Sequence, residues 1–250
     1  MTPPESETTL REDSARTAST PVAIPCEALV SLLHLCDSLF PLGAFAHSDG
    51  LEAATASHRV LGAEDVGCWL DVCLDETLGC SEGPAVVDAW RNAAAGRWGD
   101  LGGLDAEVYA LRCTSVSRRA SRAMGGRLLK TWRRIHPTAN LGPLRDSIPD
   151  GMELTLPVAF GVACASADIG ARAALAGYFY TRLAAATSAA MRLVPVGQNE
   201  AHARLASALT RMPALIDRLA ECERLPSAFA PALDIAVMSH QYVHSRLFRS

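Results

Sequence analysis

The sequence predicts an all-α protein, a single helical-bundle domain of about ten helices preceded by a disordered N-terminal tail. The first indication is composition: 49% of the 250 residues are hydrophobic but only 6% are aromatic, and alanine is abundant. This favours helices that pack closely through small side chains over a β-sandwich, which needs more aromatic and β-branched residues. In addition, apolar residues recur at the helical spacing, and proline and glycine separate these stretches.

Residues 1–25 differ from the rest of the chain. They are rich in Thr, Ser, Glu and Pro and carry few large apolar side chains. Such a segment buries too little apolar surface to offset the entropy lost on ordering, and its acidic residues argue against a transit peptide. We therefore expect a disordered tail at 1–25 and one folded domain at 26–250.

Charge and cysteine content restrict the class of protein. The net charge of −4 is mild, which argues against a nucleic-acid binder. The chain has no uncharged apolar run of about eighteen residues, so no membrane span is predicted. The eight cysteines form no CxxC pair and no signal peptide precedes them. This predicts free thiols packed in the core of a cytoplasmic protein.

The first helix is expected from Glu27 to about Phe40, because Pro41 disfavours the helical conformation of the residue before it. Five apolar side chains at helical spacing would form its buried stripe: Leu29, Leu32, Leu33, Cys36 and Leu39.

The next stretch, FPLGAFAHSDGLE at 40–52, predicts a corner between two helices. It is too apolar for an ordinary surface loop and too rich in glycine for a continuous helix. Asp49 followed by Glu52 resembles a capping box, so a helix is expected from Asp49 to about His58. Phe45 and His47 then lie on the connection. Phe45 is either the apolar plug of a structural corner or part of a protein-binding surface.

Two helices are expected next, at 63–78 and 84–95, separated by Gly83-Pro84. After a glycine-rich loop, one long helix is predicted at 105–135, with a bend at Gly125-Gly126.

One face of the 105–135 helix is basic. Its residues fall within roughly 80° of one another on a helical projection: Arg112, Arg119, Arg122, Lys130 and Arg133. The opposite side carries Met124, Leu128, Trp132 and Ile135. The basic face is solvated, or docks an acidic protein surface, or binds phosphate or nucleic acid.

Proline interrupts 136–151, which predicts an irregular connection. Leu156-Pro157 then opens a helix, and a long Ala-rich helix is expected at 168–193. A seam of small residues would let another helix, of this chain or of a second copy, approach closely: Ala167, Gly170, Ala174 and Gly177. The last two helices are expected at 199–223 and 231–244.

The C-terminus alternates two arginines with apolar side chains at Arg246, Leu247, Phe248 and Arg249, whereas chain ends are usually polar. Arginine beside aromatic and aliphatic groups is typical of interface anchors. The alternative is a disordered tail without function.

No catalytic constellation is present in the sequence, which has no P-loop, HExxH or GxSxG motif. His240 and His244 are four residues apart and could present two imidazoles to a metal on one helical face. Two ligands without a third nearby make a poor site, so both are weak metal candidates, and surface or capping roles are the alternative. No cofactor is predicted.

Several motifs together resemble the UreF family of urease accessory proteins. The corner at 40–52 resembles the family's N-terminal signature, and RLVPVGQ at 192–198 resembles its late-helix junction. PALDI at 231–235, His240 and the SRLFRS ending match its C-terminus. The motifs occur in order from about residue 29 onward, and the N-terminal tail lies outside them.

The resemblance implies a homodimeric, cytoplasmic, all-α protein that is not an enzyme. UreF-like proteins bind the accessory protein UreD (also called UreH) and recruit the GTPase UreG, and the assembly delivers nickel to apo-urease. Carried over by motif, Phe45 and Arg246 meet the GTPase, and the segment 231–250 orders on meeting UreD. The complete expected set of partner-binding residues is Phe45, His47, Ser48, Glu52, Tyr242, Arg246, Leu247, Phe248 and Arg249.

His244 stands where the family commonly has tyrosine. Two alternatives remain to a non-catalytic scaffold that binds UreD and UreG. One is a nickel-binding metallochaperone that carries the metal on its own histidines, His240 and His244. The other is an all-α enzyme with an unrecognised site.

Overall fold

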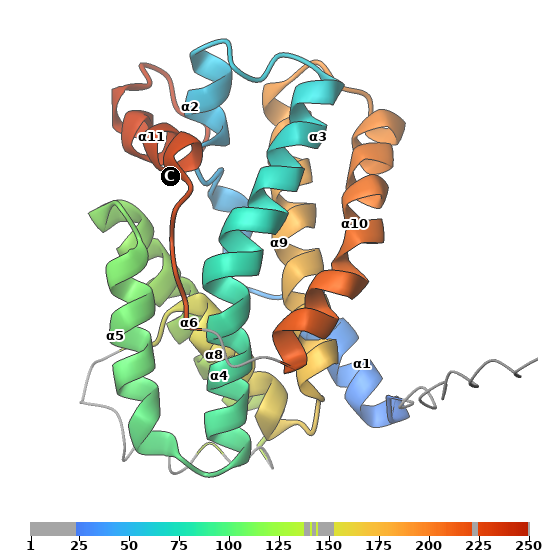
Figure 1. The fold of residues 1–250 in the computed structure, drawn as a ribbon, viewed down its shortest axis with the longest axis vertical. Coiled ribbons are helices and arrows are strands. Elements are labelled where there is room, and N and C mark those ends of the chain that lie inside the picture. The colour runs from blue at the N-terminus through green and yellow to red at the C-terminus, as the bar shows by residue number, and fades with distance from the viewer. Residues whose placement is uncertain (1–23, 138–140, 142–143, 145–152, 222–224, 250) are drawn as a thin grey trace, which may run out of the picture.

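The computed structural model describes residues 24–137, 141, 144, 153–221 and 225–249, and this part of the chain is helical and contains no strand. Figure 1 shows the helices gathered into one bundle. The predicted all-α class is therefore confirmed, while nearly all of the predicted tail lies outside the described residues. No described helix is both long and apolar enough to cross a bilayer.

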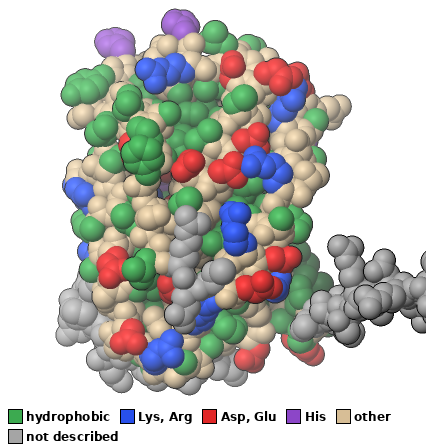
Figure 2. Space-filling model, viewed as in Figure 1, with side chains coloured by type: hydrophobic (Ala, Val, Ile, Leu, Met, Phe, Trp, Pro, Cys, Tyr) green, Lys and Arg blue, Asp and Glu red, His purple; other side chains and the backbone are tan. Residues whose placement is uncertain are grey.

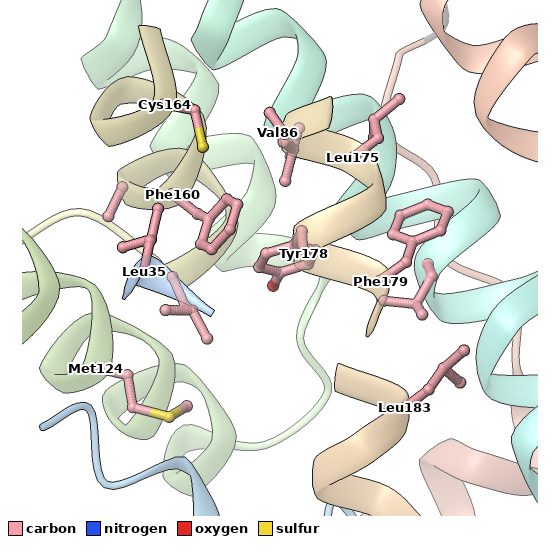
Figure 3. Close-up of a cluster of buried hydrophobic side chains, with 14 of the residues drawn as sticks. Leu35, Val86, Met124, Phe160, Cys164, Leu175, Tyr178, Phe179 and Leu183 are labelled. Carbon is pink, nitrogen blue, oxygen red and sulfur yellow. The ribbon is translucent and has the colours of Figure 1, made fainter. Parts of the chain in front are cut away.

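Helix α9 (Ala171–Leu193) lies inside the bundle and confirms the long Ala-rich helix expected at 168–193. Its neighbours are α1 (Cys26–Leu35), α2 (Leu51–Ala56), α3 (Ala63–Val72), α4 (Gly83–Ala94), α8 (Leu156–Ser166) and α10 (Gln198–Glu221). Figure 3 shows Tyr178 and Phe179 of α9 in the core, where the Tyr178 ring meets Phe160 of α8 edge-on at 5.2 Å.

Helices α3 and α4 form one continuous rod through the segment between them, so the predicted break at Gly83-Pro84 is wrong, although α4 does begin at Gly83 with Pro84 in its first turn as expected. A proline inside a regular α-helix removes a hydrogen bond and clashes with the preceding turn. Here the preceding segment, η2 (Cys73–Glu82), has wide π-helical turns, and such turns accommodate a proline without ending the helix. The rod therefore carries Glu82 into the middle of the bundle, where its side chain is buried.

The single helix expected at 105–135 is in fact two helices, α5 (Leu101–Leu111) and α6 (Ser115–Ile135). The break occurs at Thr114, whose hydroxyl accepts a hydrogen bond from the Ser117 N–H and caps α6. Helix α6 runs through the predicted bend at Gly125-Gly126 without interruption, and Gly125 lets the chain before α8 approach α6 closely. Met124, Leu128 and Trp132 are buried as predicted, whereas Ile135 is exposed.

Helix α1 ends at Leu35, earlier than the Phe40 end expected from Pro41. The predicted buried stripe is also wrong, because Leu29, Leu33 and Leu39 are exposed, Cys36 is half-buried, and Leu32 alone of the five is buried. The helix instead packs on α9 through the face that holds Leu32. A Cβ at Gly177 of α9 would lie only 2.6 Å from Leu32 Cδ1.

The seam of small residues therefore has its partner within this chain. Only Ala174 and Gly177 of the seam lie in α9, since Ala167 and Gly170 precede it.

The helix expected at 231–244 is α11 (Pro231–Ser239), followed by the 3-10 turn η4 (His240–Tyr242). The core role predicted for all cysteines holds for the buried Cys164 and for the half-buried Cys36 and Cys73, which pack against the core, whereas Cys26, Cys68 and Cys113 are exposed and Cys222 lies outside the described residues.

Candidate protein-binding surface

The corner at 40–52 contains a 3-10 turn, η1 (Ala44–Ala46), and three left-handed residues, Gly43 (φ 77°), Asp49 (φ 48°) and Gly50 (φ 92°). Gly50 is the N-cap of α2, and a Cβ there would lie 2.9 Å from the Val237 backbone nitrogen of α11. The predicted capping box is therefore wrong. Asp49 pairs with Arg182 and Glu52 points into the protein, because tertiary partners outcompete the local cap.

The side chain of Phe45 is 40% exposed, so it is not the apolar plug of the corner. Phe40 and Leu51 fill the core on either side of it instead. Ser48 is buried, and its hydroxyl accepts a long hydrogen bond of 3.5 Å from the Glu52 N–H. The corner thus presents Phe45 to the outside on a turn whose ends are packed.

The C-terminal tail, residues 243–249, lies alongside this corner. The Arg249 N–H donates to the Ala46 carbonyl at 2.8 Å. Phe248 is only 4% exposed, with the Arg192 guanidinium 4.4 Å from its ring centroid. Arg192 also donates to the Phe45 carbonyl at 3.2 Å. The structure therefore brings the corner and the tail together, although they lie at opposite ends of the folded chain.

One buried carboxylate holds the tail in this position. Glu52 is 4% exposed, and its Oε1 accepts the Leu247 N–H at 2.6 Å. Its other oxygen, Oε2, accepts the Phe248 N–H at 3.3 Å and lies 2.8 Å from His240 Nε2. The side chains of Arg246, Leu247 and Arg249 are left exposed.

The metal site considered for His240 and His244 is not formed. The helix ends at Ser239, so the two residues do not share a helical face. His240 is buried against Glu52, whereas His244 is exposed. Within the described parts of the chain, no group of three or more His, Cys, Asp or Glu side chains is arranged to hold a metal ion.

Guanidinium groups surround the corner. Arg127 of α6 donates from Nε to the Leu42 carbonyl at 2.8 Å, and Arg127, Arg192, Arg246 and Arg249 all have exposed side chains. Sequence reasoning missed Arg127 and Arg192 as members of this surface. Arg192 belongs to the RLVPVGQ motif at 192–198, but no local spacing links Arg192 or Arg127 to the corner.

Burial lowers the pKa of His47 below its ordinary value. The neighbouring Asp49 acts in the opposite direction, while Arg127 and Arg249 reinforce the lowering. His47 is therefore neutral near pH 7, and the positive charge of the surface comes from arginine. An exposed aromatic ring within a rim of guanidinium groups suits a partner that offers carboxylates around an apolar contact.

Much of the predicted basic face of 105–135 is used within the chain. Arg112 bonds Glu82 at 2.6 Å and Arg122 bonds Asp105 at 2.9 Å. Arg119 and Lys130 have exposed side chains. The face is therefore split between internal ion pairs and solvent, rather than being one continuous docking face.

An ionic cluster centred on the buried Glu82 links the corner to the core of the bundle. Glu82 accepts from Arg112 at 2.6 Å, from Arg182 at 3.2 Å and from the Tyr178 hydroxyl at 2.9 Å. Arg182 reaches on to Asp49 at 2.6 Å. This cluster joins the rod, α9 and the corner, and it lines a cavity of about 120 Å³.

The cluster keeps the carboxyl groups of Glu82 and Asp49 ionised at neutral pH. Burial by itself would raise the pKa of Glu82, but Arg182 and Arg112 outweigh it and hold the pKa below its ordinary value. The pKa of Asp49, whose side chain is 42% exposed, is also lowered by the same two guanidinium groups. The corner is thus fixed to the core by charged groups that stay charged at neutral pH.

A family model and individual relatives both relate this chain to the same family of proteins. The sequence model of the UreF family matches residues 60–209 of this chain, between the two segments that form the surface. Urease accessory protein UreF of Paenarthrobacter aurescens (strain TC1) is 31% identical over 223 residues, which cover 88% of this chain and 97% of that protein. UreF of Polaromonas sp. (strain JS666 / ATCC BAA-500) is 31% identical over 239 residues, 93% of this chain and 99% of that protein.

Proposed function

The chain belongs to the UreF family of urease accessory proteins, and from this premise we propose that it is a non-catalytic, cytoplasmic scaffold for the assembly of the nickel centre of urease. In this role it binds the accessory protein UreD (UreH), recruits the GTPase UreG and meets apo-urease. It brings no metal of its own. A scaffold that contacts one nucleotide state of a GTPase better than another shifts that equilibrium, typically by about 1–3 kcal/mol.

The observation that carries this proposal is the joining of the corner and the tail into one exposed surface. Phe45 and Arg246 come from segments at opposite ends of the folded domain, yet the Arg249 N–H bonds the corner at the Ala46 carbonyl. Exposed aromatic and arginine side chains commonly dominate the binding energy of protein interfaces. We place the GTPase contact on this surface.

Arg246→Ala tests the GTPase contact. We expect at least a tenfold loss of affinity for the GTPase with no change in fold or thermal unfolding, because the Arg246 side chain is exposed and interface hot spots are worth about 2 kcal/mol or more. The affinity is measured by titrating the GTPase against the complex of this chain with UreD. Arg218→Ala, at an exposed position on α10, is the control. Unchanged affinity in Arg246→Ala would contradict the proposal.

The outer face of α11 supports a separate contact with UreD. Ile235 and Met238 are exposed there, as are Tyr242 in η4 and Phe229 just before the helix. Figure 2 shows hydrophobic side chains gathered on the surface over this end of the molecule, whereas acidic and basic side chains alternate over α3 and α10. Exposed apolar side chains grouped in this way commonly mark a protein interface.

A homodimer fits the exposed side of α1, where Leu29, Val30 and Leu33 are exposed on the face turned away from α9. We expect Leu33→Asp to convert the dimer into a monomer, because burying an unpaired charge opposes association. Light scattering after size-exclusion chromatography measures the mass. Leu61→Asp, which changes an equally apolar and exposed residue elsewhere, should leave the dimer intact. A dimer that persists in Leu33→Asp would exclude this face.

A further inference from the structure

The feature that carries a further inference is the set of partners around the Glu52 carboxylate. Two of them are consecutive backbone N–H groups of the tail, those of Leu247 and Phe248. The third is the imidazole of His240, which is itself buried. The two backbone N–H groups donate to the carboxylate oxygens, and the imidazole donates as the third group in the tautomer that carries its proton on Nε2.

A buried carboxylate is unfavourable unless donors replace the water it has lost. Two of the three donors around Glu52 belong to the tail, so a departing tail would leave the carboxylate undersatisfied inside the protein. The carboxylate and the tail backbone therefore stabilise one another. The contact uses main-chain N–H groups, which frees the side chains of Arg246 and Leu247 to point outward; Leu247 is 65% exposed.

His240 completes this arrangement from a second element. It begins η4 directly after α11, and its Nε2 shares the Glu52 oxygen that also accepts the Phe248 N–H. This fixes the orientation of the carboxylate, so that its other oxygen faces Leu247. Phe248 and Arg249 add a buried ring over Arg192 and a bond to the corner. Glu52 is thus the point at which α2, α11 and the tail meet.

We propose that Glu52, oriented by His240, is a positioning residue that clasps the C-terminal tail to the corner and so sets Arg246 and Leu247 beside Phe45. The role of this clasp in partner binding rests on the proposed function, whereas its existence does not. The partner it serves is the acidic, apolar-centred protein surface expected to meet the guanidinium groups and Phe45. Without the clasp the same side chains would remain on the chain but would no longer form one surface.

Glu52→Gln tests the clasp in the full-length protein. The amide keeps the size of the side chain but replaces one acceptor oxygen with a donor, which opposes the tail N–H groups. We expect hydrogen–deuterium exchange of the Leu247–Arg249 amides to become at least tenfold faster. Glu107→Gln, at an exposed carboxylate on α5, should leave their exchange unchanged. Exchange of the α9 amides reports whether the fold is retained.

His240→Asn is the second variant, for the case in which Glu52→Gln does not fold. It leaves Glu52 and both tail N–H groups in place and removes only the orienting imidazole. We expect the same tail amides to exchange faster than in the unaltered protein, but by a smaller factor than in Glu52→Gln. Tail exchange equal to that of the unaltered protein in every folded variant would overturn the clasp.

Binding of the GTPase then separates the clasp from the proposed function. With Arg246→Ala as the reference for a lost contact, Glu52→Gln should weaken GTPase binding at least tenfold while leaving Arg246 in the chain. If the tail is released and Arg246→Ala abolishes binding but Glu52→Gln does not weaken it, the positioning role is overturned and the proposed function stands. If Arg246→Ala has no effect, the proposed GTPase contact fails, and the clasp is judged by exchange alone.

Discussion

Glu82→Gln is expected to lower the free energy of unfolding by about 3 kcal/mol at pH 7, because removing one partner of a buried ion pair strands the others. Glu82 is 2% exposed and accepts hydrogen bonds from Arg112, Arg182 and Tyr178. The glutamine keeps the shape but not the charge. The guanidinium groups of Arg112 and Arg182 would then share the carboxylate of Asp49, which pairs with Arg182.

The pH dependence gives this prediction a second measurement. The pKa of Glu82 lies below its ordinary value of 4.5 in the folded protein, so folding is favoured by its ionised form. That stabilisation is complete above the unfolded pKa and is lost as the pH falls through the folded pKa. The difference in unfolding free energy between the unaltered protein and Glu82→Gln should therefore narrow as the pH falls below about 4.5.

Urea titrations at several pH values measure both effects. Glu64→Gln is the matched control, because Glu64 also pairs with an arginine, Arg204, but its side chain is 82% exposed. Exposed pairs contribute about 0–1 kcal/mol, so the control should stay within that range at every pH. A Glu82→Gln variant that behaves like Glu64→Gln would show that the cluster does not stabilise the fold.

The helices that sequence reasoning predicted well are those with regular apolar spacing and a clear start signal. Leu156-Pro157 opens α8, and α9 follows the Ala-rich pattern at 168–193. The errors occur where contacts or caps that the apolar spacing does not reveal determine where a helix begins or ends. Pro84 is tolerated because the preceding turns are π-helical, and the chain breaks at Thr114 through a cap that the longer apolar and basic pattern concealed.

Sequence reasoning named the corner and the tail as candidate segments, but it did not predict how the two segments meet or that Arg127 and Arg192 lie beside them. Family resemblance placed Phe45 and Arg246 at one surface, and the tail does lie against the corner. Glu52, however, matched a local capping rule, and its actual partner His240 is 188 residues away. Local spacing carries no information about contacts at that separation. The same reason hid Arg192, which lies 147 residues from the Phe45 carbonyl that it bonds.

Gly125→Ala is expected to destabilise the fold by about 3 kcal/mol. Adding atoms to a packed site typically costs about 1–3 kcal/mol, and the cost is at the upper end where the neighbouring atoms cannot move. In a free helix the same change would stabilise by about 0.5–1 kcal/mol. Here a Cβ would lie 2.1 Å from the Leu154 carbonyl oxygen and 2.9 Å from the Thr155 carbonyl carbon. The steric effect therefore exceeds the helical propensity and reverses its sign.

The backbone opposite Gly125 cannot simply retreat. The Thr155 N–H donates to the buried Asp105 carboxylate at 2.6 Å, and the Leu156 N–H donates to Ser121 at 3.1 Å. Relieving the overlap would break these bonds at the start of α8. Gly103→Ala is the control, since nothing lies within 4 Å of a Cβ there, and it should gain about 0.5 kcal/mol. Urea unfolding should give opposite signs for the two variants; equal shifts would show that α6 and the chain before α8 are not in close contact.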